Sequence, residues 1–349
     1  MHTFFVQHRS PHHAGYSGYD RLLDHYPMAE NITGQSSLPY IIAKWLSRLT
    51  NQKAGLYNSS SVLKDFELYK ALKRLKGAPA CVHYLNAERD IRFVVKYKKY
   101  FKNVVFCGTF HKPPHILDWR VNDPKFVKHL DGAIVVGRNQ LEYVKQCFGI
   151  PKVSYIPHGV DTTFFYPDFE KRLPQRLLFV GQHLRDFETL NYCVPRLAEQ
   201  IKDLQVHVII HPAYKQRIQQ HNCITILDGL TDEALRLEYQ QASMLFLPML
   251  ESTACNSILE ALACGLPILT TNVGGNQAYL EKTQNILIPI DKPSMFVDEA
   301  ITLLKDLPRI NELSILSRKI ALEYDWKIIS DEVLDFHNML NENRIKNVI

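Results

Sequence analysis

Eleven short apolar runs alternate with longer amphipathic segments along this 349-residue chain, and this alternation constrains its fold more than any other feature. Most of the runs are continuously apolar, as strands buried on both faces of a parallel sheet are. They span residues 3–7, 80–85, 103–107, 132–136 and 153–156 in the first half, and 176–181, 205–210, 223–227, 243–248, 267–271 and 286–289 in the second. Strands that alternate with helices form βαβ units with right-handed crossovers, so two sets predict two doubly wound α/β domains.

The composition fits two ordinary domains, with 46% hydrophobic residues. No apolar run reaches the roughly 18 residues of a membrane helix, and the N-terminus lacks the pattern of a signal peptide. The seven cysteines are scattered and form no C-x-x-C pair. We therefore expect a soluble cytoplasmic protein with reduced thiols and without a zinc site.

Charge divides unevenly between the two halves. Residues 1–170 hold 23 Lys and Arg against 14 Asp and Glu, a net charge of +9, whereas residues 171–349 have a net charge of −4. A basic first half indicates an anionic partner or surface. Lysines and aromatic residues mix in segments 68–76 and 96–102, which suits peripheral contact with an anionic membrane as well as an ordinary solvated face. No nucleic-acid-binding motif accompanies them.

The segment 256–276 carries the strongest functional signal. It predicts a short helix, a glycine stop at Gly265, a buried strand and a second glycine turn at Gly274-Gly275. One acid, Glu260, lies within the otherwise apolar helix, and burying a carboxylate without a partner is costly. A hydroxyl-rich ligand at the carboxyl end of the sheet would supply that partner; a carboxylate paired inside the protein is the alternative.

This segment resembles the donor-binding signature of glycosyltransferase family 4, and the connector 157–167 resembles the interdomain stretch of the same enzymes, Pro-x-Gly-Val-Asp followed by Phe and Pro. The resemblance implies the GT-B fold, in which two Rossmann-like domains face each other across a cleft and the last helix crosses back to the first domain. We therefore predict an acceptor-binding domain over residues 1–165, a nucleotide-sugar-binding domain over 166–330, and a C-terminal helix over 331–349 packed on the first domain.

The resemblance also implies donor-binding residues. The loop with Gly15 and Gly18 follows the first strand and would approach the donor diphosphate through backbone N–H groups. Arg185 follows the first strand of the second half and would act on the diphosphate, with Gln182 where family members commonly carry another Arg. Arg185 on a solvated helix face is the alternative. Glu260 would accept the ribose hydroxyls.

The family's first glutamate has no direct counterpart, because Ser252 stands at its position and Glu251 lies one residue earlier. Glu251 is the candidate for contact with the donor sugar, and helix-start residues are the alternative. The remaining candidate donor-binding residues are Asn256, Ser257, Gly274, Gly275 and Asn276.

Two residues in the first half are candidates for the reacting and acceptor side. His111 follows the run 103–107 and would face the reaction centre, although a structural loop histidine gives the same pattern. Glu88 would bind acceptor hydroxyls or cap the next helix. Three histidines near the glycine loop, His8, His12 and His13, lack an acidic or cysteine partner at ligand spacing, so we expect no metal site there.

The resemblance to family 4 implies a retaining, metal-independent glycosyltransferase of the hexosyl type. It would need no cofactor and would move a sugar from a UDP- or GDP-sugar to a glycan or lipid-linked acceptor hydroxyl. His111, Arg185 and Glu251 would be its catalytic residues. The alternatives are a nucleotide-sugar-binding protein without transfer activity, and a nucleotide-sugar hydrolase or epimerase of the same fold.

Overall fold

The computed structural model describes residues 1–7, 15–35, 38–49, 58–121 and 124–346, and it divides into two compact units. Among the described residues, unit 1 comprises 1–7, Tyr19–His158 and 327–346, and unit 2 comprises 15–18 and Gly159–Trp326. The change of unit after His158 falls inside the predicted connector, and the short segment 15–18 leaves unit 1 to join unit 2. The histidines His8, His12 and His13 lie outside the described residues.

Unit 1 is built on a parallel six-stranded sheet with the order β2-β1-β3-β4-β5-β6. Its strands are β1 (His2–Val6), β2 (Glu30–Ile32), β3 (Ala80–Tyr84), β4 (Val104–Phe110), β5 (Gly132–Val135) and β6 (Val153–Tyr155). Its helices are η1 (Tyr19–His25), α1 (Tyr40–Ser47), α2 (Asn58–Arg74), α3 (Ala87–Asp90), α4 (Phe93–Lys96), η3 (Lys98–Tyr100), α5 (Pro114–Arg120), η4 (Val127–His129), η5 (Arg138–Gln140), α6 (Leu141–Phe148) and α13 (Trp326–Lys346).

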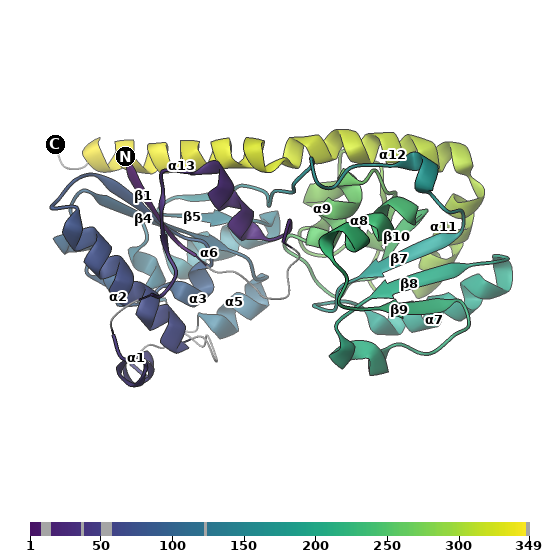
Figure 1. Ribbon diagram of the computed structural model, residues 1–349, viewed down its shortest axis with the longest axis horizontal. Helices are drawn as coiled ribbons and strands as arrows, with labels where there is room; N and C mark the ends of the chain where they lie inside the picture. The colour runs from purple at the N-terminus through teal and green to yellow at the C-terminus, as the bar shows by residue number, and fades with distance from the viewer. Residues whose placement is uncertain (8–14, 36–37, 50–57, 122–123, 347–349) are drawn as a thin grey trace. The chain divides into compact units, whose positions relative to one another are not determined.

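The two faces of this sheet are covered by different parts of the chain. Helices α2, α3, α5 and α6 share one apolar core with side chains such as Val82 and Phe106. The long helix α13 lies along the other face, as Figure 1 shows for the yellow helix over β1, β4 and β5. A Cβ on Gly132 would overlap Phe336 and Leu340 at 2.8 Å, so the absence of a side chain there lets α13 approach β5 closely.

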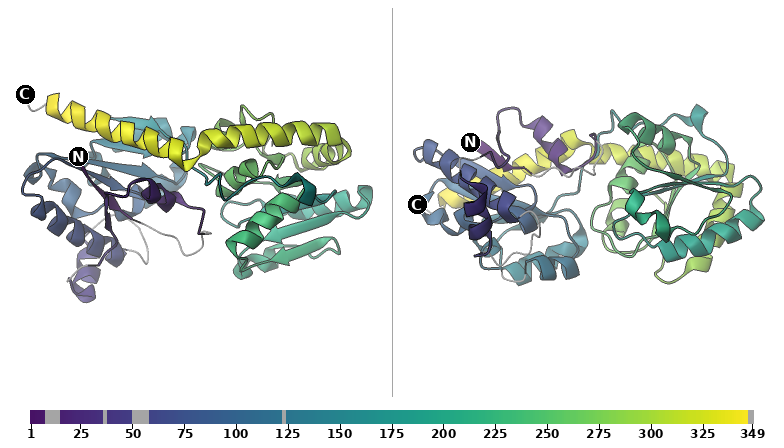
Figure 2. Two further views of the ribbon diagram at one scale, coloured as in Figure 1. Left: turned by 45° about the horizontal axis from the view of Figure 1, so that its top comes forward. Right: turned by 60° about the horizontal axis from the view of Figure 1, so that its bottom comes forward.

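Unit 2 is built on a second parallel six-stranded sheet with the order β12-β11-β10-β7-β8-β9. Its strands are β7 (Arg176–Val180), β8 (Gln205–Ile209), β9 (Ile224–Leu227), β10 (Met244–Leu247), β11 (Ile268–Thr271) and β12 (Ile286–Ile288). Its helices are η6 (Phe169–Lys171), α7 (Phe187–Gln200), η7 (Pro212–Arg217), α8 (Asp232–Gln241), α9 (Asn256–Ala263), α10 (Asn276–Leu280), α11 (Pro293–Lys305), α12 (Leu307–Ala321) and η8 (Leu322–Tyr324). Figures 1 and 2 show helices on both sides of this sheet.

The predicted α/β class with two Rossmann-like units is confirmed, and each of the eleven predicted strands is present. Two details differ from the sequence prediction. Strand β4 continues to Phe110 instead of ending at Cys107, because Gly108 stays extended and pairs with Tyr84 and Ala133. Strand β2 was not predicted, since its three residues include Glu30 and Asn31. No helix among the described residues has both the length and the apolar character needed to cross a bilayer.

Candidate functional site

Helix α9 brings the acid Glu260 into the interior of unit 2. The helix follows β10, and seven of its eight residues are buried because it packs between the sheet and α12. It ends at Gly265, whose φ of +62° lies in the left-handed region that glycine adopts without strain. Glu260 itself is 5% exposed, so its carboxylate needs partners inside the protein or from a ligand.

Two hydroxyl groups of unit 2 supply such partners. The Tyr239 hydroxyl on α8 donates to Glu260 Oε2 at 2.7 Å, and the Ser17 hydroxyl donates to Oε1. Burial raises the pKa of the Glu260 carboxyl, and the two donated hydrogen bonds oppose that rise. These contacts match the alternative considered in the sequence analysis, a carboxylate paired inside the protein. A ribose that reaches Glu260 would share or replace the hydrogen bond from Ser17.

Ser17 belongs to the predicted glycine loop, which lies on unit 2 in the described part. Tyr16 stacks on Phe164 with ring centroids 3.7 Å apart. Gly15 lies close to the Asp232 side chain at the start of α8, since a Cβ on Gly15 would lie 2.7 Å from Asp232 Oδ2. Gly18 has a φ of +113°, which only glycine adopts readily. The loop therefore reaches the surroundings of Glu260 and the start of α8.

Arg185 is buried beside the start of α9. Its guanidinium donates to the Val180 carbonyl at 2.9 Å, to the His183 carbonyl at 3.0 Å and to Ser257 Oγ at 3.2 Å. It is 8% exposed and precedes α7, so it does not occupy the solvated helix face considered as the alternative. Held in this way, the guanidinium is a fixed cation at the carboxyl end of β7.

Glu251 and the glycine pair come together at the ends of β10 and β11. The Gly275 N–H donates to the Ser252 carbonyl at 3.1 Å, and the Ser252 N–H donates to Glu251 Oε1 at 2.9 Å. A Cβ on Gly274 would overlap both Ser252 O and Glu251 Oε1, and one on Gly275 would overlap the Thr253 carbonyl. Two glycines are thus required for the two loops to touch.

The other candidate donor-binding residues lie around the same strand ends. Asn256 is the first residue of α9, after Cys255 at the N-cap position. Asn276 is buried and donates to the Thr271 carbonyl at 2.9 Å, which fixes the start of α10. Gln182 accepts from the His211 N–H at 3.4 Å and so spans the ends of β7 and β8.

In unit 1, His111 and Glu88 are joined. The His111 N–H donates to Glu88 Oε1 at 3.1 Å, and His111 Nε2 lies 2.7 Å from the Leu85 carbonyl, which can only accept, so this nitrogen carries the proton. The Glu88 side chain is buried, and burial raises its pKa to about 7, while nearby Lys112 opposes the rise. Asn86 holds the N-cap position of α3, so Glu88 links the ends of β3 and β4 instead of capping that helix.

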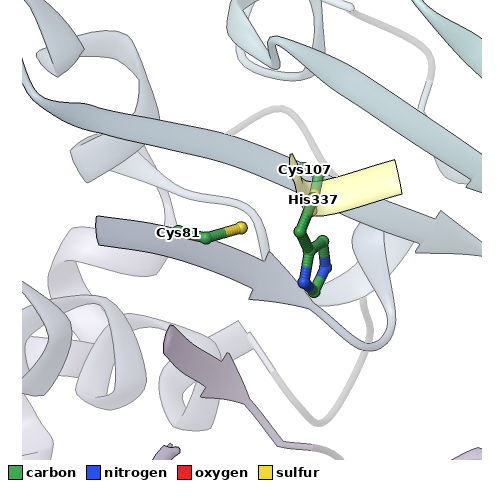
Figure 3. A group of neighbouring side chains, drawn as sticks. All are labelled: Cys81, Cys107 and His337. Atoms are coloured by element: carbon green, nitrogen blue, oxygen red, sulfur yellow. The ribbon is translucent and has the colours of Figure 1, made fainter. Parts of the chain in front are cut away.

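One group of potential metal ligands occurs among the described residues. Figure 3 shows this group, which consists of Cys81 on β3, Cys107 on β4 and His337 on α13. Their potential ligand atoms lie within 4.8 Å of one another. All three are buried, and His337 Nε2 lies 3.0 Å from His83 Nδ1. Burial raises the pKa of the Cys107 thiol well above its usual range, so a neutral thiol suits this core position.

The structure thus brings the unit 2 candidates Arg185, Ser257 and Glu260 together, places Glu251 with Gly274 and Gly275, and joins His111 to Glu88 within unit 1. Sequence reasoning missed the partners of Glu260. Tyr239 fits an ordinary apolar position of an amphipathic helix, and Ser17 lies 243 positions away along the chain. No local pattern signals either contact.

Comparison with known proteins finds a family that matches part of the chain. Residues 174–306 match the family described as glycosyl transferases group 1, a region that contains Arg185, Glu251 and Glu260. The chain is therefore related to the group 1 glycosyl transferases, and the resemblance found in its sequence is confirmed.

Two curated proteins are similar to this chain in sequence. Over 145 residues the chain is 29% identical to a subunit of human phosphatidylinositol N-acetylglucosaminyltransferase, covering 39% of this chain and 30% of the relative. Over 231 residues it is 22% identical to phosphatidyl-myo-inositol mannosyltransferase of Propionibacterium freudenreichii, covering 63% and 59%. The chain thus matches about a third and about three fifths of their lengths.

Solved structures agree on the fold. Sucrose-phosphate synthase of Thermosynechococcus elongatus superposes with a TM-score of 0.66 at 17% identity, over 97% of this chain and 88% of that chain. Anabaena HepE in complex with UDP and glucose gives a TM-score of 0.65 at 12% identity, over 97% and 100%. At such identities the likeness concerns the fold alone.

Proposed function

We propose that the protein is a glycosyltransferase that moves a sugar, of the hexosyl type, from a nucleotide-diphosphate sugar to an acceptor hydroxyl in glycan or glycolipid biosynthesis. The observation that carries the proposal is the grouping of Arg185, Ser257 and Glu260 at one end of the unit 2 sheet, inside the region that matches the group 1 family. Ligands of open α/β sheets bind at this end of the strands.

Each residue has a role in this proposal. Arg185, fixed by two backbone carbonyls, meets the charge that develops on the leaving diphosphate, together with the backbone N–H group of Gly274. Glu260 accepts a ribose hydroxyl, and Glu251 contacts the donor sugar. The reaction retains anomeric configuration and uses no metal or cofactor, as the family resemblance implies.

The acceptor side is proposed for unit 1. His111 lines the reacting face, and Glu88, a buried carboxyl with a pKa of about 7, receives an acceptor hydroxyl. A lipid-linked acceptor is the class that we favour, because both curated relatives carry phosphatidylinositol in their names and unit 1 carries the basic half of the chain. The basic unit makes peripheral contact with an anionic membrane.

The test is product formation with UDP- and GDP-sugars and phosphatidylinositol-type acceptors, followed by mass spectrometry of the lipid and by the anomeric configuration of the product. Transfer that persists in EDTA with retention supports the proposal. Nucleotide binding without transfer to any acceptor favours a binding protein, and release of free sugar favours a hydrolase.

A further inference from the structure

Helix α1 of unit 1 presents its large apolar side chains to solvent. The small side chains Ala43 and Ser47 face inward, where α1 packs on α2. The large side chains Ile41 and Trp45 are 81% and 59% exposed. A surface helix of a globular protein normally turns its large apolar side chains toward the core. The exposed apolar face of α1 therefore indicates a surface that binds an apolar partner.

The exposed side chains form one stripe. Ile41, Trp45 and Leu49 follow one another at intervals of four residues, so they lie on one side of α1 and its final turn. Lys44 and Arg48 are exposed beside the stripe. Figures 1 and 2 show α1 at the outer edge of unit 1 beside α2. Bulky apolar side chains flanked by cations are typical of helices that lie in a membrane interface.

An apolar pocket opens beneath this helix. It has a volume of about 500 Å³ and is lined by α1, α2 and the segment 93–101, including Leu46, Val62, Phe66, Tyr69, Phe93 and Phe101. This volume lies within the range of roughly 300–1,000 Å³ that is usual for small-molecule sites.

Among the described residues that line the pocket, the one acid is Asp65, and its carboxylate accepts hydrogen bonds from the backbone. Its Oδ2 accepts from the Phe93 N–H at 3.0 Å and from the Val94 N–H at 3.1 Å, which fixes the start of α4. Burial raises the pKa of Asp65 to about 7, so the neutral form is readily reached in this environment. The pocket therefore suits a hydrocarbon chain better than a polar ligand.

Cations surround the pocket. Lys73 Nζ stands 5.7 Å from the ring centroid of Tyr69, and Lys99 Nζ stands 5.1 Å from that of Tyr100, and both rings line the pocket. Lys70 Nζ lies 4.8 Å from the ring centroid of Phe66. An occupant with an apolar chain and an anionic headgroup complements this arrangement, because lysines near a membrane surface attract anionic lipids.

We propose that unit 1 docks on an anionic lipid bilayer through the stripe Ile41–Trp45–Leu49, and that the pocket takes one hydrocarbon chain of a bound lipid. Lys73 and Lys99 then meet the headgroup. Burying a hydrocarbon chain is favourable for every CH₂ group removed from water, so a partly inserted chain adds to the electrostatic attraction. The inference deepens the proposed function, because the choice of a lipid partner partly rests on that function. The residues of the docking surface are separate from the candidate donor-binding residues in unit 2.

Vesicle sedimentation of the full chain tests the docking surface. We expect binding to phosphatidylcholine vesicles that contain phosphatidylserine, weaker binding to phosphatidylcholine alone, and at least a tenfold loss in the double variant I41S/W45S. These side chains are exposed, so the variant should fold. The matched control is Ile315→Ser on α12 of unit 2, where Ile315 is 65% exposed, and its vesicle binding should equal that of wild type. Equal binding by wild type and I41S/W45S overturns the proposal.

A fluorescent fatty acid, used below its micelle concentration, tests the pocket. We expect saturable binding that Leu46→Trp, which fills the pocket from the α1 wall, reduces at least tenfold. Val62→Trp fills it from α2 and serves if the first variant fails to fold. Unchanged fatty-acid binding in folded forms of both variants contradicts the assignment of the pocket.

Thermal-shift titration with UDP and GDP on the same samples separates the two proposals. If I41S/W45S loses vesicle binding but keeps the nucleotide-induced thermal shift of wild type, the docking surface is confirmed independently of the donor site. Vesicle binding without any nucleotide shift leaves the docking surface standing and counts against the proposed transferase. A nucleotide shift with no vesicle binding by wild type sinks the docking surface alone.

Discussion

Replacing Glu88 by Gln should stabilise unit 1 against opening at high pH. Glu88 is 3% exposed, and its pKa is raised from 4.5 to about 7, chiefly by burial. The folded chain therefore binds a proton at a pH where the unfolded chain has released it. The penalty for the buried carboxylate is present above about pH 7 and disappears as the pH falls toward about 4.5. The glutamine side chain has no charge to bury and keeps an oxygen that can accept from the His111 N–H.

The magnitude follows from the shift. A rise of about 2.5 pKa units, from 4.5 to about 7, corresponds to roughly 3 kcal/mol at 1.36 kcal/mol for each unit. The free energy of opening of Glu88→Gln minus that of wild type should therefore increase by about 3 kcal/mol between about pH 4 and about pH 9. The side-chain amide introduced by Glu88→Gln costs about 1–3 kcal/mol if its N–H groups stay unpaired. This cost does not depend on pH, so it changes the difference between variant and wild type by the same amount at every pH.

Hydrogen exchange of peptides from β3 and β4 is the suitable assay, because a chain with two units has no single two-state unfolding free energy. Asp65→Asn is the matched control. Asp65 is another buried carboxyl whose pKa is raised to about 7, so it should show the same pH trend in unit 1. Under the proposed function Glu88→Gln lowers sugar transfer. A difference that stays constant with pH would refute the reasoning about Glu88.

Two further substitutions test the unit 2 loops. Gly274→Ala adds a Cβ that overlaps the Ser252 carbonyl at a φ of +51°, so we expect the loop with Glu251 to shift and transfer activity to fall at least tenfold, with β3 and β4 exchange in unit 1 unchanged. Arg185→Lys loses the fork that spans the Val180 carbonyl and Ser257, so nucleotide affinity measured by calorimetry should fall about tenfold or more, and wild-type affinity would argue against the role of Arg185.

The strands were predictable because they are apolar and continuous. β7 and β10 are buried on both faces, so every residue from Leu177 to Val180 and from Met244 to Leu247 follows the expected composition. β2 was not predictable, because Glu30 and Asn31 give a three-residue edge strand no apolar signal. Its position depends on pairing with β1, which is a tertiary contact.

The candidate site shows the same limit. The helix, glycine stop and glycine turn around Glu260 follow from local propensity, and the structure has α9, β11 and α10 in that order. The contacts that decide the state of Glu260 come from Tyr239 and Ser17, which reach it only after the sheet has formed. Likewise, the inward face of α1 carries Ala43, and only packing on α2 shows that its large side chains remain outside.

Thermal-shift titration with UDP, GDP, ADP and their sugar conjugates, on wild type and Glu260→Ala, tests the central claim most directly. A ligand that binds only the native state increases the free energy of unfolding, by about 2.7 kcal/mol at a ligand concentration of a hundred times Kd. The melting temperature rises accordingly. The proposed function predicts a shift with one nucleotide that is lost in Glu260→Ala. Absence of a shift with every nucleotide, or an equal shift in Glu260→Ala, would contradict the donor site.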